Sequence, residues 1–124
     1  MILTKAMRAW FDCEFCSFDD VRPISIGIVV EDGRESYEEY CFDAAKCSAW
    51  VREHVIPRLG GGGSLDLEGV SELICDTSYD ERIIRELGID IPVRQVKQLP
   101  EQERKRLFTH HALEDARVLH SLYP

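Results

Sequence analysis

The chain has 124 residues, of which 44% are hydrophobic. This length supports one hydrophobic core and is too short for a second, so we expect a single domain over residues 1–124. Its 23 acidic residues outnumber its 15 basic residues, and the net charge of −8 argues against binding nucleic acid through a broad basic surface.

The first part of the chain predicts three strands, over Ala6–Phe15, Ile24–Val30 and Glu35–Phe42. The second and third are joined by Glu31–Arg34, whose Asp-Gly dipeptide is a strong hairpin signal.

The first of these strands carries an Asp-x-Glu motif. Side chains alternate between the two faces of a strand, so Asp12 and Glu14 project from the same face, within reach of one cation. The neighbouring Trp10, Phe11 and Phe15 indicate a buried strand, where unpaired charges are costly. We therefore interpret the two carboxylates as metal ligands rather than as an exposed face of an edge strand.

A helix is predicted over Ala45–Leu59, because Trp50, Val51, Val55 and Leu59 follow helical spacing. The tract Gly60–Ser64 comes next and is expected to be a flexible connector. The sequence leaves open whether this tract is an engineered linker or a native glycine-rich turn.

The second half predicts alternating elements. These are strands at Leu73–Thr77 and Pro92–Val96, and helices at Glu81–Leu87, Glu101–Leu107 and His111–Leu122. Strands followed by alternating helices and strands predict an α/β layered domain.

Asp80 stands where the apolar run of the fourth strand has ended and a helical pattern begins. Most lone aspartates at helix starts are N-caps, so capping of the helix Glu81–Leu87 competes with metal binding at this position. Asp76 is a nearby alternative ligand.

Two adjacent histidines precede the last helix. His110 lies five residues before Asp115, whereas His111 lies four residues before it and could pair with it on one helical face. His110 would project from the helix start toward a bound substrate, and we favour it as the functional histidine. His54 and His120 are interpreted as surface or packing histidines.

The order of these motifs resembles that of the DEDDh family of 3′-5′ exonucleases, which have Asp-x-Glu, a lone Asp after a strand, and His-x-x-x-x-Asp. Within that family the chain is most similar to bacterial and phage RNase AS-type exoribonucleases, and the similarity continues through Pro23–Glu35 and Trp50–Pro57. The resemblance implies a ribonuclease H-like mixed sheet of about five strands flanked by helices.

The resemblance also implies a role for each motif residue. Asp12, Glu14, Asp80 and Asp115 would hold two Mg²⁺ or Mn²⁺ ions, with Asp12 bridging them, and His110 would be the general base. Oxygen ligands suit these ions, and two of them can serve both ends of an in-line phosphodiester displacement. The implied substrate is the 3′ end of single-stranded RNA, with a preference for adenylate-rich RNA.

Two further groups are candidate substrate contacts. Phe15 and Phe18 could stack on the terminal base, although both could equally be core aromatics. Arg104, Lys105 and Arg106 precede His110 in a basic segment that would either contact phosphates or form a solvated helix.

Two other functions stay open: a 3′-5′ exonuclease of single-stranded DNA, and a catalytically weak module that binds protein or nucleic acid. A homodimer is also left open. Five cysteines, with neither a signal peptide nor an apolar run that could span a bilayer, predict a cytoplasmic location, structural thiols and no membrane partner.

Overall fold

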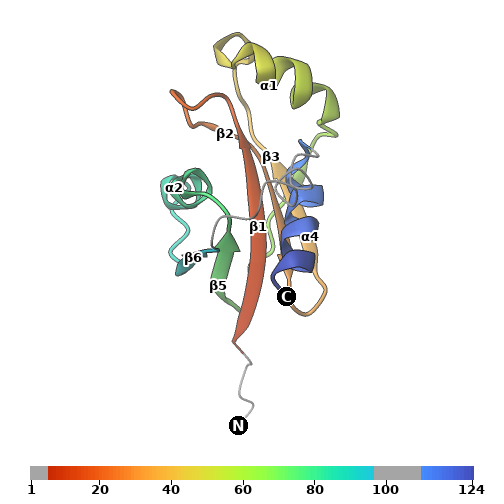
Figure 1. Ribbon diagram of the computed structural model, residues 1–124, viewed down its shortest axis with the longest axis vertical. Helices are drawn as coiled ribbons and strands as arrows, with labels where there is room; N and C mark the ends of the chain where they lie inside the picture. The colour runs from red at the N-terminus through yellow and green to blue at the C-terminus, as the bar shows by residue number, and fades with distance from the viewer. Residues whose placement is uncertain (1–5, 97–109) are drawn as a thin grey trace.

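The computed structural model describes residues 6–96 and 110–124. One mixed sheet organises these residues, with strand order β4-β3-β2-β1-β5-β6 (Figure 1). The strands are β1 (Met7–Phe15), β2 (Pro23–Val30), β3 (Glu35–Glu39), β4 (Gly63–Ser64), β5 (Val70–Cys75) and β6 (Val93–Gln95). The pairs β1–β2, β2–β3 and β3–β4 are antiparallel, whereas the pairs β1–β5 and β5–β6 are parallel.

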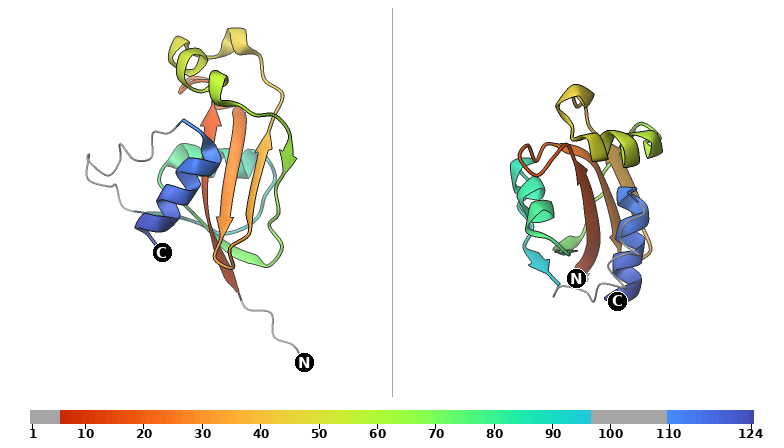
Figure 2. Two further views of the ribbon diagram at one scale, coloured as in Figure 1. Left: turned by 90° about the vertical axis from the view of Figure 1, so that its right-hand side faces the viewer. Right: turned by 45° about the horizontal axis from the view of Figure 1, so that its top comes forward.

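Helices cover both faces of the sheet, with α2 (Ser78–Glu86) on one face and α4 (Ala112–Leu122) on the other (Figure 2). The alternation of β1 side chains explains this arrangement. Phe11 and Cys13 pack in a cluster with Ile83 of α2, while Trp10 packs against Leu119 of α4. Asp12 and Glu14 share the face of Trp10 and therefore lie on the α4 side.

The predicted α/β layered sheet with flanking helices is confirmed, and the sheet has six strands where the sequence predicted about five. The additional strand lies inside the glycine tract. Gly63 pairs with Glu38 and Ser64 with Tyr37, and the backbone amides of Gly60 and Gly61 donate to the Glu39 carboxylate at 2.8 and 2.7 Å. The tract is thus hydrogen-bonded to β3 along its length. The sequence predicted a flexible connector here and did not predict this pairing.

The single helix predicted over Ala45–Leu59 is divided into three short helical pieces: η1 (Ala44–Lys46), α1 (Ala49–His54) and η2 (Ile56–Arg58). The Ser48 hydroxyl accepts from Val51 N at 3.1 Å and starts α1. Pro57 provides no backbone N–H, so the segment continues only as a 3₁₀ turn.

Gly27 in the middle of β2 determines how closely α4 approaches the sheet. A Cβ at this position would overlap the backbone of Ala112 and Leu113 at the start of α4. Gly27 is also the cross-strand partner of Asp12. The absence of a side chain at this position therefore allows α4 to bring its first turn over Asp12.

The predicted helix Glu101–Leu107 lies outside the described residues. In the described part of the chain, no helix is long and apolar enough to cross a membrane. All five cysteines are free thiols, and Cys41 is exposed while the other four are buried.

Candidate active site

A cavity of about 520 Å³ opens where the carboxyl ends of the parallel strands β1 and β5 meet. In α/β sheets this edge is the usual place for a ligand. All five carboxylate and histidine positions that the sequence predicted line this cavity. They are Asp12 and Glu14 of β1, Asp80 of α2, His110 just before α4, and Asp115 of α4. The fold thus brings all five together.

Two groups of three carboxylates share one member. Oxygens of Asp12, Glu14 and Asp115 lie within 4.8 Å of one another, and so do oxygens of Asp12, Asp76 and Asp80. Asp12 is common to both groups, so the site has the residues to hold two neighbouring cations with one shared ligand.

Asp76 belongs to this site although the sequence indicated it only as an alternative to Asp80. It follows directly after β5, which ends at Cys75, and β5 lies beside β1 in parallel orientation. Asp12 on β1 and Asp76 after β5 therefore reach the same end of the sheet. The signal in the sequence was the position of Asp76 at the end of an apolar strand.

The interpretation of Asp80 as a helix N-cap is wrong. Thr77 is the N-cap of α2, and its hydroxyl accepts from Asp80 N at 3.3 Å. The Asp80 carboxylate instead connects two elements: Oδ1 accepts from Cys13 N of β1 at 3.1 Å, and Oδ2 accepts from the Thr77 hydroxyl at 2.8 Å. These two hydrogen bonds fix a carboxylate that is only 2% exposed.

The carboxylates are held in a setting that disfavours their charged forms. Burial, followed by the nearby charges of Asp80, Glu14 and other carboxylates, raises the pKa of Asp12 well above its usual range. Burial and the charges of Asp115 and Asp76 raise the pKa of Glu14 to about 8. Burial and Asp76 also raise the pKa of Asp80. A divalent cation would remove this repulsion, so the donor set fits hard metal ions.

The two adjacent histidines point to different surroundings. His110 lines the cavity and adopts a left-handed backbone conformation with φ of 63°. His111 is the extended N-cap residue of α4, and its ring stacks on Tyr37 with centroids 4.7 Å apart. Burial, then the charges of His54 and Arg58, lower the pKa of His110.

Aromatic side chains form the rim of the site. Phe15 lines the cavity but is partly buried, packed between Phe18 at 5.6 Å and Tyr79 at 5.5 Å. Phe18 is 71% exposed and Trp50 is 49% exposed. Trp50, which the sequence analysis placed in the apolar stripe of a helix, therefore belongs to the rim.

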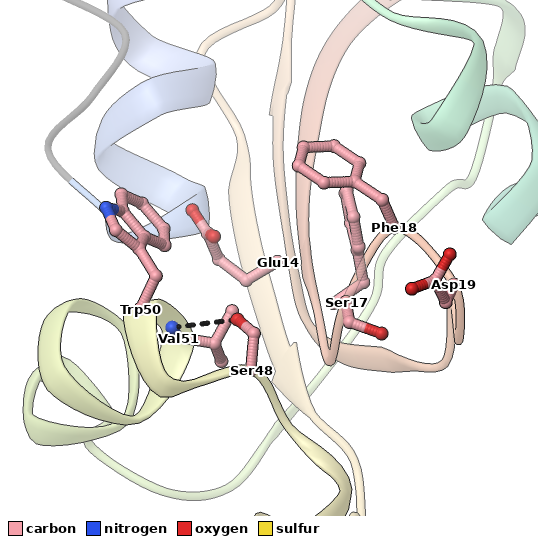
Figure 3. A pocket seen from close by; sticks show the side chains of 8 residues that line it. Glu14, Ser17, Phe18, Asp19, Ser48, Trp50 and Val51 are labelled. Atoms are coloured by element: carbon pink, nitrogen blue, oxygen red, sulfur yellow. Dashed lines mark hydrogen bonds between the residues drawn. The ribbon is translucent and has the colours of Figure 1, made fainter.

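A second pocket of about 280 Å³ adjoins the cavity and shares Glu14, Phe15, Phe18 and Trp50 with it. Figure 3 shows Trp50 on α1 and Phe18 on the loop after β1 on opposite sides of the Glu14 carboxylate. Flat apolar faces thus border the acidic residues on two sides. The basic candidates Arg104, Lys105 and Arg106 lie outside the described residues.

The architecture defines a class: an α/β mixed sheet that presents two linked carboxylate groups suited to divalent cations at the ends of its parallel strands. Over 55 residues the chain is 46% identical to a 3′-5′ exoribonuclease of Mycobacterium tuberculosis strain CDC 1551 / Oshkosh. It matches a 3′-5′ exoribonuclease of strain ATCC 25618 / H37Rv to the same extent.

The aligned segment covers 43% of this chain and 33% of each relative, so the chain matches about a third of the length of these curated relatives. No family model matches the chain. The similarity supports a relationship with exoribonucleases at this coarse level.

Proposed function

We propose that this chain is a metal-dependent 3′-5′ exoribonuclease of the DEDDh type that hydrolyses single-stranded RNA from its 3′ end. The observation that carries the proposal is the pair of carboxylate groups that share Asp12. The relatives named 3′-5′ exoribonucleases support the RNA substrate and the direction of attack.

The site is suited to two Mg²⁺ or Mn²⁺ ions, which prefer oxygen ligands. When bound, such a pair supplies a nucleophile at neutral pH and stabilises the oxygens of an in-line displacement. Glu14, Asp12 and Asp115 would hold one ion, and Asp12 with Asp76 would hold the other. Because both oxygens of Asp80 already accept hydrogen bonds from Cys13 and Thr77, Asp80 would act mostly through water.

His110 is the proposed general base. It lines the same cavity as Asp12 and Asp115, and its lowered pKa keeps the ring neutral, so that it can accept a proton near neutral pH. His111 stacks on Tyr37 and would instead support the start of α4.

The aromatic rim would bind the bases. Phe18 and Trp50 expose their rings beside the carboxylates, and stacking contributes about 1–3 kcal/mol per base. Phe15, which the sequence analysis proposed as a base contact, would act mainly by supporting Phe18. Such stacking requires unpaired bases and fits a single-stranded substrate.

The deciding experiment uses oligonucleotides of RNA and DNA labelled at the 5′ end, incubated with Mg²⁺, with Mn²⁺ or with chelator. We expect a ladder that shortens from the 3′ end of RNA, requires metal and is absent for Asp12→Asn. Degradation of DNA alone would change the substrate, and inert RNA and DNA under every condition would favour a binding module.

A further inference from the structure

The helical segment from Ala49 to Arg58 consists of α1 and the 3₁₀ turn η2, which meet at Val55. Val51 and Val55 are buried against the core. The residues directly before them, Trp50 and His54, together with Arg58, form a second row at the same spacing, which we call the 50–54–58 row. The buried valines fix the rotation of α1 and therefore the direction of Trp50 and His54, and Arg58 follows in η2.

Ring contacts connect the row to the site. The Trp50 ring lies 4.7 Å from the His110 ring and 4.9 Å from the His54 ring, centroid to centroid. The rings of His54 and His110 are 5.6 Å apart. Trp50 lines the acidic cavity, whereas His54 and Arg58 lie outside its lining. The row therefore begins at the cavity and leads away from it.

Arg58 carries the fixed positive charge of the row. It is exposed, and it has no carboxylate partner among residues 6–96 and 110–124. It lies about one helical turn after His54, whose ring is 5.6 Å from that of His110. The His54 side chain is 40% exposed, and its one ion-pair contact within the described residues is a long one to Glu53, at 3.9 Å. In a chain of net charge −8, the row thus carries an arginine without a carboxylate partner in the described residues, on the segment that borders an acidic cavity.

When the 3′ end of an RNA strand lies at the carboxylates, the upstream part of the strand must leave the cavity along the protein surface. The row offers a flat ring first and a guanidinium last, roughly 12–16 Å further along at about 1.5 Å per residue in α1 and about 2.0 Å in η2. That length accommodates more than one nucleotide, because a strand with stacked bases advances about 3.4 Å per nucleotide along its axis.

We propose that the 50–54–58 row is the exit track for the RNA strand, on which Trp50 stacks a base and Arg58 binds backbone phosphates upstream of the scissile bond. This inference rests on the proposed exoribonuclease function. It identifies the residues that select longer strands over dinucleotides, because a dinucleotide has no phosphate that reaches Arg58.

The test compares Arg58→Gln with Arg52→Gln. Arg52 is a matched control because it is an exposed arginine of the same segment but lies outside the row. Steady-state hydrolysis is measured on a dinucleotide and on a ten-nucleotide RNA over a range of salt concentrations. The measurements are made at alkaline pH, where His110 is neutral with or without the Arg58 charge. For Arg58→Gln we then expect a several-fold higher KM on the ten-nucleotide RNA, an unchanged kcat, and a salt slope smaller by about 0.7. On the dinucleotide the variant should equal the unmodified protein.

Neutral methylphosphonate linkages upstream of the scissile bond should remove the difference between Arg58→Gln and the unmodified protein. Equal effects of Arg52→Gln and Arg58→Gln, or an effect that persists on the dinucleotide, would overturn the track. Binding of fluorescent ten-nucleotide RNA, measured by anisotropy with Ca²⁺, separates the two proposals. Loss of affinity in Arg58→Gln without any hydrolysis by the unmodified protein would retain the track and reject the enzyme.

Discussion

The floor of the cavity and its rim are built in opposite ways. The floor carries Asp12, Asp80 and Asp115 on regular strands and helices, and Asp80 and Asp115 are each 2% exposed. The rim carries Trp50 on a six-residue helix and Phe18 on a loop, and both are among the most exposed large apolar side chains of the described residues.

This difference reflects two physical demands. Clustered buried carboxylates repel one another, so their positions must be imposed by elements that are stabilised elsewhere in the core. Stacking on a base requires an exposed flat ring but tolerates variation in position. We therefore expect changes in the floor to affect chemistry and metal binding, and changes in the rim to affect substrate affinity.

The floor should be most sensitive at Asp12, because this residue belongs to both carboxylate groups. Asp12→Asn should lower hydrolysis by more than about 100-fold. Residues that only hydrogen-bond to metal ligands typically cost up to about 100-fold when replaced, and a ligand should cost more. Millimolar Mn²⁺ should raise the melting temperature of the unmodified protein and leave that of the variant nearly constant. A Mn²⁺ response that Asp12→Asn retains would place the metal elsewhere.

Replacing each of the two adjacent histidines should distinguish a residue that acts in the reaction from one that supports the start of α4. His110→Ala should slow hydrolysis by on the order of 10²–10⁴ with little change in the Mn²⁺ response, because it removes a base and no ligand. His111→Ala removes the stacking on Tyr37 and should have a far smaller effect on rate. Single-turnover rates at saturating RNA measure both, and a larger loss at His111 would reject the assignment.

Gly27→Ala tests whether packing positions the floor. The added Cβ would push against the backbone of Leu113, so α4 must shift, at a cost of about 1–3 kcal/mol. Because α4 carries Asp115, affinity for Mn²⁺ should fall although no ligand has changed. Gly60→Ala, where a Cβ meets open space, is the control. Urea unfolding and Mn²⁺ titration provide the two measurements.

The pH dependence of stability should also originate in the floor. Glu14 has a folded-state pKa of about 8 against a usual value of 4.5, so the unfolded chain releases its proton first as pH rises. The metal-free protein should therefore lose stability between about pH 4.5 and 8, and Mn²⁺ should offset this loss. Melting curves across this range, with chelator and with Mn²⁺, test it; equal slopes in both series would contradict it.

The smallest effect concerns the glycine tract, which pairs with β3. Gly63 has φ of 97° and a Cβ there would overlap the Tyr37 carbonyl, so Gly63→Ala should destabilise the protein by about 1–2 kcal/mol. Gly60→Ala should be nearly neutral. Equal unfolding midpoints for the two variants would indicate that the tract behaves as a free connector.

The sequence by itself determined the strand that carries Asp12 and Glu14, because the twofold alternation of a strand is a local property. It also determined the α/β order of elements and the spacing between His110 and Asp115. It did not assign Asp76 to the site beside Asp80, because only the parallel pairing of β5 with β1 brings the two segments to one edge.

The tertiary structure alone decided the direction of Trp50 and the depth of α4. Helical spacing placed Trp50 in the same stripe as Val51, and packing of the valines against Cys16 and Ile24 turned the tryptophan outward instead. Likewise, Gly27 reads as one more residue of an apolar strand, yet its missing side chain lets α4 approach Asp12. Both outcomes depend on which distant surface a segment meets, and that information is absent from local periodicity.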